Sequence, residues 1–130
     1  MKKTTSYLIL LILIVFSSNK VTSQIVPVNL RCEFLQNPMG IDILNPRLSW
    51  ELTGESKNEF QTAYRVIVAS SESILNTDKG DIWDSKIINS DQSINLKYQG
   101  VSLQTGKIYF WKVKAWDKDK KESEWRNHPP

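Results

Sequence analysis

The sequence predicts an all-β protein, an antiparallel β-sandwich, and two observations support this class. After residue 23, apolar and polar residues alternate in segment after segment, as in strands that bury one face. The same region holds no helical apolar stripe long enough for a βαβ crossover. Residues 24–130 are enough for one domain with a single hydrophobic core.

Residues 1–23 have the pattern of a cleavable signal peptide. Two lysines follow the first methionine, and a continuously apolar run covers residues 7–16. A helix of that length spans roughly 15 Å, about half of a bilayer core of about 30 Å, which disfavours a permanent anchor. Small Ser23 precedes the expected cut before Gln24. We therefore expect an exported protein, periplasmic or extracellular, with no membrane contact after cleavage.

Removal of the signal peptide changes the charge of the protein. The full chain has 17 basic and 14 acidic residues, and Lys2, Lys3 and Lys20 lie within the signal peptide. The mature part is then neutral, which argues against nucleic acid or an anionic membrane as a partner. Cys32 is the single cysteine, so no internal disulfide is expected, and its place in the alternation predicts a small buried hydrophobe.

The alternation divides residues 24–130 into short predicted strands. In residues 26–34 the even-numbered residues from Val26 to Phe34 are expected to face inward. In residues 94–98, Ile94 is expected to share a face with Leu96 and Tyr98. Residues 61–70 are apolar on both faces, which is typical of a central strand. The predicted strands are residues 26–34, 47–53, 61–70, 82–85, 94–98 and 107–117, with a hairpin turn at 117–121 and a stub at 123–126.

The last strand is expected to be incomplete. After the turn, the sequence offers only residues 123–126 before a segment that ends in Pro129 and Pro130. Proline cannot donate to a β-ladder, so the edge of residues 107–117 is expected to lie largely unpaired. Such an edge favours association with other chains, and the domain is expected to be C-terminally incomplete.

One spacing resembles a known structural device. Leu103 precedes by six residues Tyr109, which begins an alternating strand. This resembles the corner of fibronectin type III domains where the tyrosine hydroxyl bonds to upstream backbone. Trp50 in an early strand and Trp111 in a late one also fit that core. The resemblance implies a fibronectin type III or immunoglobulin-like sandwich with a structural tyrosine corner at Leu103 and Tyr109.

A second resemblance covers nearly all of residues 24–130. The strings LRCEF, NPMGID, PRLSW, QTAYRV, GDIWDS and WDKD followed by SEW occur in this order. Together they are similar to the N-terminal domain of bacterial α-L-rhamnosidases, glycoside hydrolases of family 78. The resemblance implies a leading sandwich whose partners are the downstream domains of that enzyme. It also implies that the catalytic (α/α)6 barrel lies outside this sequence. In that barrel, acidic residues would hydrolyse the linkage of terminal rhamnose with inversion of configuration.

Within the chain itself, the acidic residues do not form a catalytic motif. Asp81 and Asp84 flank Trp83, an arrangement that is superficially similar to a sugar site with a stacking aromatic. A turn and a short edge strand explain the three residues better, because a small sandwich commits its faces to its core. Inverting hydrolysis needs two carboxyls across a cleft, one with a raised pKa.

No metal or cofactor motif is present in the sequence either. Asp117 and Asp119 resemble the start of a calcium loop, but Lys121 stands at the next ligand position and the required glycine is missing. His128 is the one histidine, so a catalytic triad or zinc site has no partners. We expect no catalytic, cofactor-binding or metal-binding residue, and no cofactor.

Two tryptophans remain for an interaction surface. Trp50 and Trp111 are assigned to the core and Trp83 to its edge, which leaves Trp116 and Trp125. We expect these two to pack together or against a following domain, with ring stacking on carbohydrate as the alternative. The predicted function is a non-catalytic accessory domain that docks a catalytic one. The alternatives are a carbohydrate-binding or cell-surface adhesion module and a small active hydrolase, which lacks a motif.

The signal-peptide interpretation predicts that the exported protein starts at Gln24. Intact-mass measurement of secreted material checks this, because cleavage after Ser23 gives one defined mass. Recovery of the uncleaved chain in membranes would instead show that residues 1–23 are an anchor.

Overall fold

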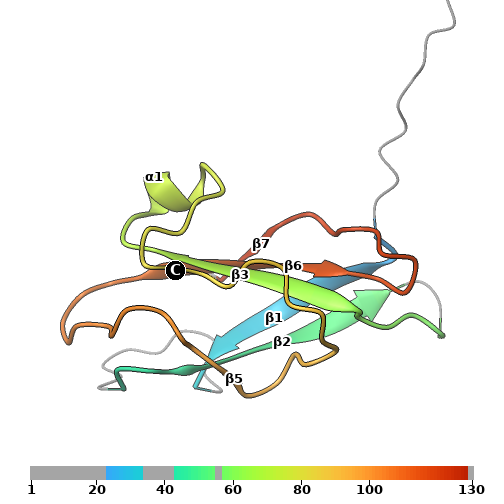
Figure 1. The fold of residues 1–130 in the computed structure, drawn as a ribbon, viewed down its shortest axis with the longest axis horizontal. Coiled ribbons are helices and arrows are strands. Elements are labelled where there is room, and N and C mark those ends of the chain that lie inside the picture. Colours follow the sequence, from blue (N-terminus) through green and yellow to red (C-terminus); the bar gives the residue numbers. More distant parts are fainter. Residues whose placement is uncertain (1–22, 34–42, 55–56, 129–130) are drawn as a thin grey trace, which may run out of the picture.

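Two antiparallel sheets form the structure, a computed structural model that describes residues 23–33, 43–54 and 57–128 (Figure 1). The strand order is β1-β2-β5 in one sheet and β4-β3-β6-β7 in the other. The predicted all-β, immunoglobulin-like sandwich is confirmed. The elements are β1 (Ile25–Cys32), β2 (Arg47–Gly54), β3 (Ala63–Ala69), α1 (Glu72–Leu75), β4 (Trp83–Asp84), β5 (Leu96–Lys97), β6 (Phe110–Trp116) and β7 (Arg126–Asn127).

The core lies between the two sheets, with a smaller apolar cluster outside the second sheet. β3 lies between β4 and β6, as predicted for a central strand, and buries both of its faces. Ile67 and Ala69 face α1 and pack on Leu75. The one-turn helix α1 was not predicted, because four residues are too few to show a helical period. The main core contains Leu30, Leu48, Trp50, Tyr64, Val66, Val68, Leu96, Tyr98, Trp111 and Val113.

A buried polar contact fixes the largest core side chain. The Nε1–H of Trp50 donates to Oε1 of Gln61 at 3.0 Å, and both residues are buried. The Nε2 of Gln61 donates to the carbonyl oxygens of Ser90 and Gln92, at 3.0 and 2.9 Å. One amide side chain therefore satisfies an indole and two backbone carbonyls that lie inside or beside the core.

The prediction of which residues of β1 face inward was wrong for the first half of the strand. Ile25 and Pro27 are buried, whereas Val26 and Val28, which were expected inward, are half-buried. The cause is a bulge: the register with β2 shifts by one residue between Val28 and Arg31, and Asn29 has a φ of 49°. Beyond the bulge the even-numbered residues face inward as expected, beginning with Leu30, which is buried. Phe34 lies outside the described residues.

The fifth strand is shorter than predicted. Leu96 and Tyr98 are buried as expected, but Ile94 is exposed. Asn95 has a φ of 56°, which breaks the extended backbone that alternation requires. Its backbone N–H donates to the Ser49 hydroxyl at 3.2 Å, so the chain joins β2 by a side-chain contact before the ladder of β5 begins.

The free edge expected on β6 is paired over most of its length. The hairpin turn at 117–121 is confirmed by mutual backbone bonds between Asp117 and the residues near Lys121. The returning chain follows β6 because the two prolines come only after its last pairing residue. Five residues of the returning chain pair with β6, in these pairs: Glu122 with Trp116, Ser123 with Ala115, Arg126 with Val113, Asn127 with Lys112, and His128 with Trp111. Self-association was expected because the edge of β6 was predicted to be unpaired. Since this edge is mostly paired, that reason no longer applies.

The first and last strands belong to different sheets but are joined across one edge of the sandwich. The backbone N–H of Ser23 donates to the Glu122 carbonyl at 3.1 Å. The guanidinium Nε of Arg126 donates to the Pro27 carbonyl at 3.1 Å.

In the described part of the chain, no helix has the length and apolar character needed to cross a membrane.

Replacement of Gln61 tests the buried polar contact. Gln61→Leu keeps the size of the side chain but leaves the Trp50 N–H and two carbonyls without their partner. We expect the free energy of unfolding to fall by about 2–3 kcal/mol. Denaturant unfolding measures the change, with Gln104→Leu as the control because the Gln104 side chain is exposed. Equal effects of the two substitutions would contradict a structural role for the Gln61 amide.

Candidate functional site

The two aspartates beside Trp83 are both engaged as hydrogen-bond acceptors. The Asp84 carboxylate accepts two bonds from the Arg65 guanidinium, at 2.7 and 3.0 Å, and others from Lys86. The Arg65 bonds hold the pKa of Asp84 well below its usual range. Asp81 accepts from the backbone N–H and hydroxyl of Ser70, which lowers its pKa. Both carboxylates are therefore held ionised, the opposite of what a general acid requires.

The Trp83 ring closes the core at the edge strand β4. It is half-buried, packs against the main core and meets Tyr98 edge to face, with ring centroids 5.2 Å apart. Gly100 lies so close that a Cβ there would stand 2.5 Å from Trp83 Cβ. The ring therefore serves packing, as the sequence predicted, and its edge-strand position accounts for its partial exposure.

Asp117 organises the turn after β6. The carboxylate is fully buried and accepts from the backbone N–H groups of Asp119 and Lys121 on Oδ1 and of Gln24 on Oδ2, at 2.9 to 3.0 Å. Burial alone would raise its pKa, but the bonds from Gln24, Lys121 and Asp119 lower it below the usual value. Among the described residues, no group of three or more acidic, His or Cys side chains is placed to hold a metal.

Cys32 and His128 both pack within the domain. Cys32 is half-buried against the core, and burial, aided by the charge of Glu33, raises the pKa of its thiol to about 11. A thiol with that pKa stays protonated at neutral pH, in agreement with the predicted role as a small hydrophobe. The His128 ring stacks on Trp111 with centroids 5.5 Å apart.

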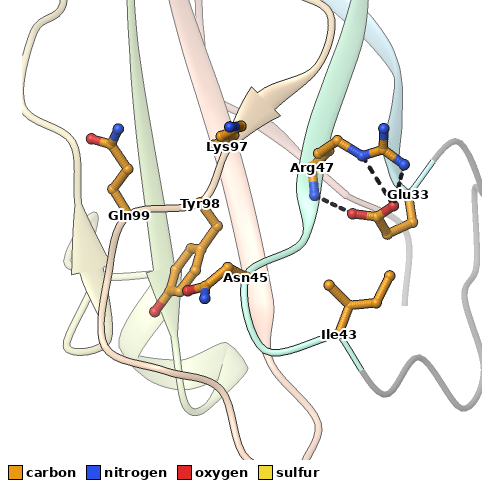
Figure 2. A pocket seen from close by; sticks show the side chains of 7 residues that line it. All are labelled: Glu33, Ile43, Asn45, Arg47, Lys97, Tyr98 and Gln99. Atoms are coloured by element: carbon orange, nitrogen blue, oxygen red, sulfur yellow. Dashed lines mark hydrogen bonds and ion pairs between the residues drawn. The ribbon is translucent and has the colours of Figure 1, made fainter.

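An open depression lies where the start of β2 meets β5 (Figure 2). On one side, the Glu33 carboxylate is paired with the Arg47 guanidinium at 2.9 and 3.2 Å, and these bonds lower the pKa of Glu33. Tyr98 is buried, its hydroxyl donates to the Val101 carbonyl, and burial raises its pKa to about 12. The depression is lined by Glu33, Ile43, Asn45, Arg47, Lys97, Tyr98 and Gln99.

Among the described residues, the lining of this depression does not supply the groups that glycoside hydrolysis requires. Glu33 is the one carboxylate that the described residues contribute, so they place no acid and base pair across it. Tyr98, the one aromatic that the described residues place in the lining, has its ring packed in the core and offers no platform for a sugar.

Trp125 lies on the outer face of the second sheet, close to three cations. Its ring centroid is 4.8 Å from Lys114 Nζ, 5.1 Å from Lys112 Nζ and 5.8 Å from Arg65 Cζ. Its apolar contact is the cluster of Ile67, Ala69 and Leu75. The ring is thus engaged within its own domain.

Each of the three cations has its own carboxylate. Arg65 pairs with Asp84, Lys112 with Asp78, and Lys114 with Glu122. Lys112 is only 4% exposed, so this ion pair is partly buried. Trp116 is half-buried at the end of β6, and among the described residues it makes no ring contact with Trp125. Trp125 lies instead beside Lys112 and Lys114, nearer the start of β6, and packing of either tryptophan against a following domain stays a prediction.

Tyr109 joins two parts of the connection that precedes β6. Its hydroxyl accepts the backbone N–H of Gln104 at 2.9 Å, and both Leu103 and Tyr109 pack against the main core. A bond from the tyrosine hydroxyl to upstream backbone is the contact that defines a tyrosine corner. The strand itself begins at Phe110, three residues later than the sequence predicted.

Comparison with known proteins assigns the fold to a family. A family model described as the Rha78A-like, N-terminal immunoglobulin domain matches residues 27–128. The chain belongs to this family. Curated relatives include α-L-rhamnosidases of Streptomyces avermitilis, 42% identical over 93 residues, and of Formosa agariphila, 39% identical over 89 residues. These matches cover 72% and 68% of this chain but 9% of each relative.

Solved structures agree with the family assignment. The α-L-rhamnosidase from Dictyoglumus thermophilum superposes with a TM-score of 0.75 at 46% identity, over 78% of this chain and 12% of that one. The Streptomyces avermitilis α-L-rhamnosidase complexed with L-rhamnose gives a TM-score of 0.73 at 39% identity, over 78% of this chain and 10% of that one. The chain thus spans about a tenth of the length of the relatives it matches.

The lowered carboxylate pKa values predict loss of stability in acid. Glu33, Asp81, Asp84 and Asp117 all have folded-state pKa values below their usual ones. Their contribution is present above the unfolded pKa of about 4 and is lost as pH falls through the folded values. We expect the free energy of unfolding to decrease between about pH 5 and pH 2.

Asp117→Asn should reduce this acid dependence and lower stability at pH 7 by about 1–3 kcal/mol, because a buried carboxylate with three N–H donors is replaced. Denaturant unfolding at several pH values measures both effects, and Asp119→Asn is the control because Asp119 is exposed. A pH dependence unchanged by Asp117→Asn would contradict this account.

Proposed function

We propose that this chain is a non-catalytic N-terminal domain of an exported α-L-rhamnosidase-like glycoside hydrolase, and that it docks against the domains that follow. The observation that carries the proposal is the lowered pKa of the carboxylates that were candidates for catalysis. Asp81, Asp84 and Glu33 are all hydrogen-bonded so that their pKa values fall. Inverting hydrolysis needs one carboxyl with a raised pKa, separated from a base by roughly 6.5–9.5 Å.

The family assignment supports placement in a larger enzyme. The matching model describes an N-terminal domain, and the matched relatives are α-L-rhamnosidases of which this chain covers 9–12%. In this proposal, cleavage of terminal rhamnose belongs to a catalytic domain outside the present sequence. Export rests on the pattern of residues 1–23.

Docking is better supported than carbohydrate binding. A sugar-binding module needs an aromatic ring exposed beside polar groups, and Trp125 is instead half-buried, packed on the cluster of Ile67, Ala69 and Leu75 and close to three paired cations. Tyr98 in the open depression is buried. Both rings therefore contribute to packing within the domain.

The proposal predicts that purified residues 24–130 release no rhamnose from an aryl α-L-rhamnoside. The complete Streptomyces avermitilis α-L-rhamnosidase, assayed alongside, shows that the assay detects turnover. The asparagine variants Asp81→Asn and Asp84→Asn provide the decisive comparison. Turnover by residues 24–130 that survives repurification and disappears in either variant would overturn the accessory-domain proposal.

A further inference from the structure

The chain leaves the sandwich at a defined end. β7 runs antiparallel to β6, and the backbone N–H of His128 donates to the Trp111 carbonyl at 3.0 Å, near the start of β6. Residues 43–46, which precede β2, and residues 98–109, which precede β6, lie at this same end (Figure 1). The last described residue therefore stands beside these two connections.

These connections present large apolar side chains to solvent. Ile43, Leu44, Val101 and Ile108 are 46%, 49%, 69% and 77% exposed, and we call them the apolar end. The connections are joined by backbone bonds from Leu103 to the Leu44 carbonyl at 3.3 Å and from Tyr98 to the Pro46 carbonyl at 3.0 Å.

The apolar side chains are held in place by ordered backbone. Val101 accepts the Tyr98 hydroxyl on its carbonyl, and Ile108 precedes Tyr109, whose hydroxyl is bonded to Gln104. Exposed apolar side chains gathered on a rigid surface are typical of an interface with another protein surface. The apolar end therefore fits an apolar partner with little reorganisation.

We infer that the apolar end is the surface on which the next domain of an α-L-rhamnosidase-like enzyme packs. The inference rests on the proposed function and adds the surface to it. In the matched relatives, this domain is N-terminal and accounts for 9–12% of the length, so most of the enzyme follows it. A segment that continues from His128 starts beside the apolar end, which places this end within reach of the following domain.

The opposite end provides a matched comparison. Ile87 is 55% exposed and lies next to Ile88, which pairs with Tyr64 near the start of β3. That position is separated from the chain exit by most of β6, since Tyr64 pairs with Ala115 and His128 bonds to Trp111. Ile87, 55% exposed against 77% for Ile108, is thus an exposed isoleucine away from the proposed contact.

Thiol labelling tests the inference. Ile108→Cys and the control Ile87→Cys are each made in a Cys32→Ala background. Labelling rates with a maleimide are compared between the isolated chain and a fusion in which the chain replaces the N-terminal domain of the Streptomyces avermitilis α-L-rhamnosidase. We expect the rate at position 108 to fall about tenfold or more in the fusion, because interface packing excludes the reagent, and the rate at position 87 to stay unchanged.

The remaining outcomes separate the two proposals. Protection at position 87 alone, or at both positions, would overturn the assignment of the apolar end while docking itself stands. No protection at either position would overturn docking together with the surface. Rhamnosidase turnover by the fusion reports its folding. If the fusion does not fold, the same labelling is done on the isolated chain with the remainder of the Streptomyces enzyme added in trans.

Discussion

The buried amide of Gln61 joins both sheets to the long connection between β4 and β5. It stands before β3, accepts from Trp50 in β2 and donates to Ser90 and Gln92 in the connection. The Trp50 ring meets Tyr64 of β3 edge to face at 5.4 Å. The chain must cross here from one sheet to the other, and its backbone carbonyls would lack partners beside the core without this amide. The position of β5, and with it the open depression, depends on that contact.

Much of the fold follows from side-chain alternation, because alternation is a local property of each strand. β3 buries both of its faces, as predicted for a central strand, and Trp50 of β2 lies in the core as predicted. β1 was only half predicted, since residues 25–28 are apolar at all four positions and give no sign of which set faces inward. The bulge at Asn29 decides this, and a bulge depends on pairing with β2 that a single strand cannot reveal.

The polar contacts of the candidate site were largely beyond sequence reasoning. Arg65 and Asp84 are 19 residues apart, and Lys112 and Asp78 are 34 apart. No local pattern could show that Trp125 lies against Lys112. That contact exists because residues 122–128 follow β6. The prolines come after this ladder and do not prevent it.

The chain crosses the sandwich from end to end. Ser23 and Gln24 are bonded to the turn after β6, whereas His128 is bonded near the start of β6. At about 3.3 Å per residue, the length of β6 separates these two points by roughly 20 Å. The expected first residue of the exported protein, Gln24, and the exit of the chain at His128 therefore lie at opposite ends of the sandwich.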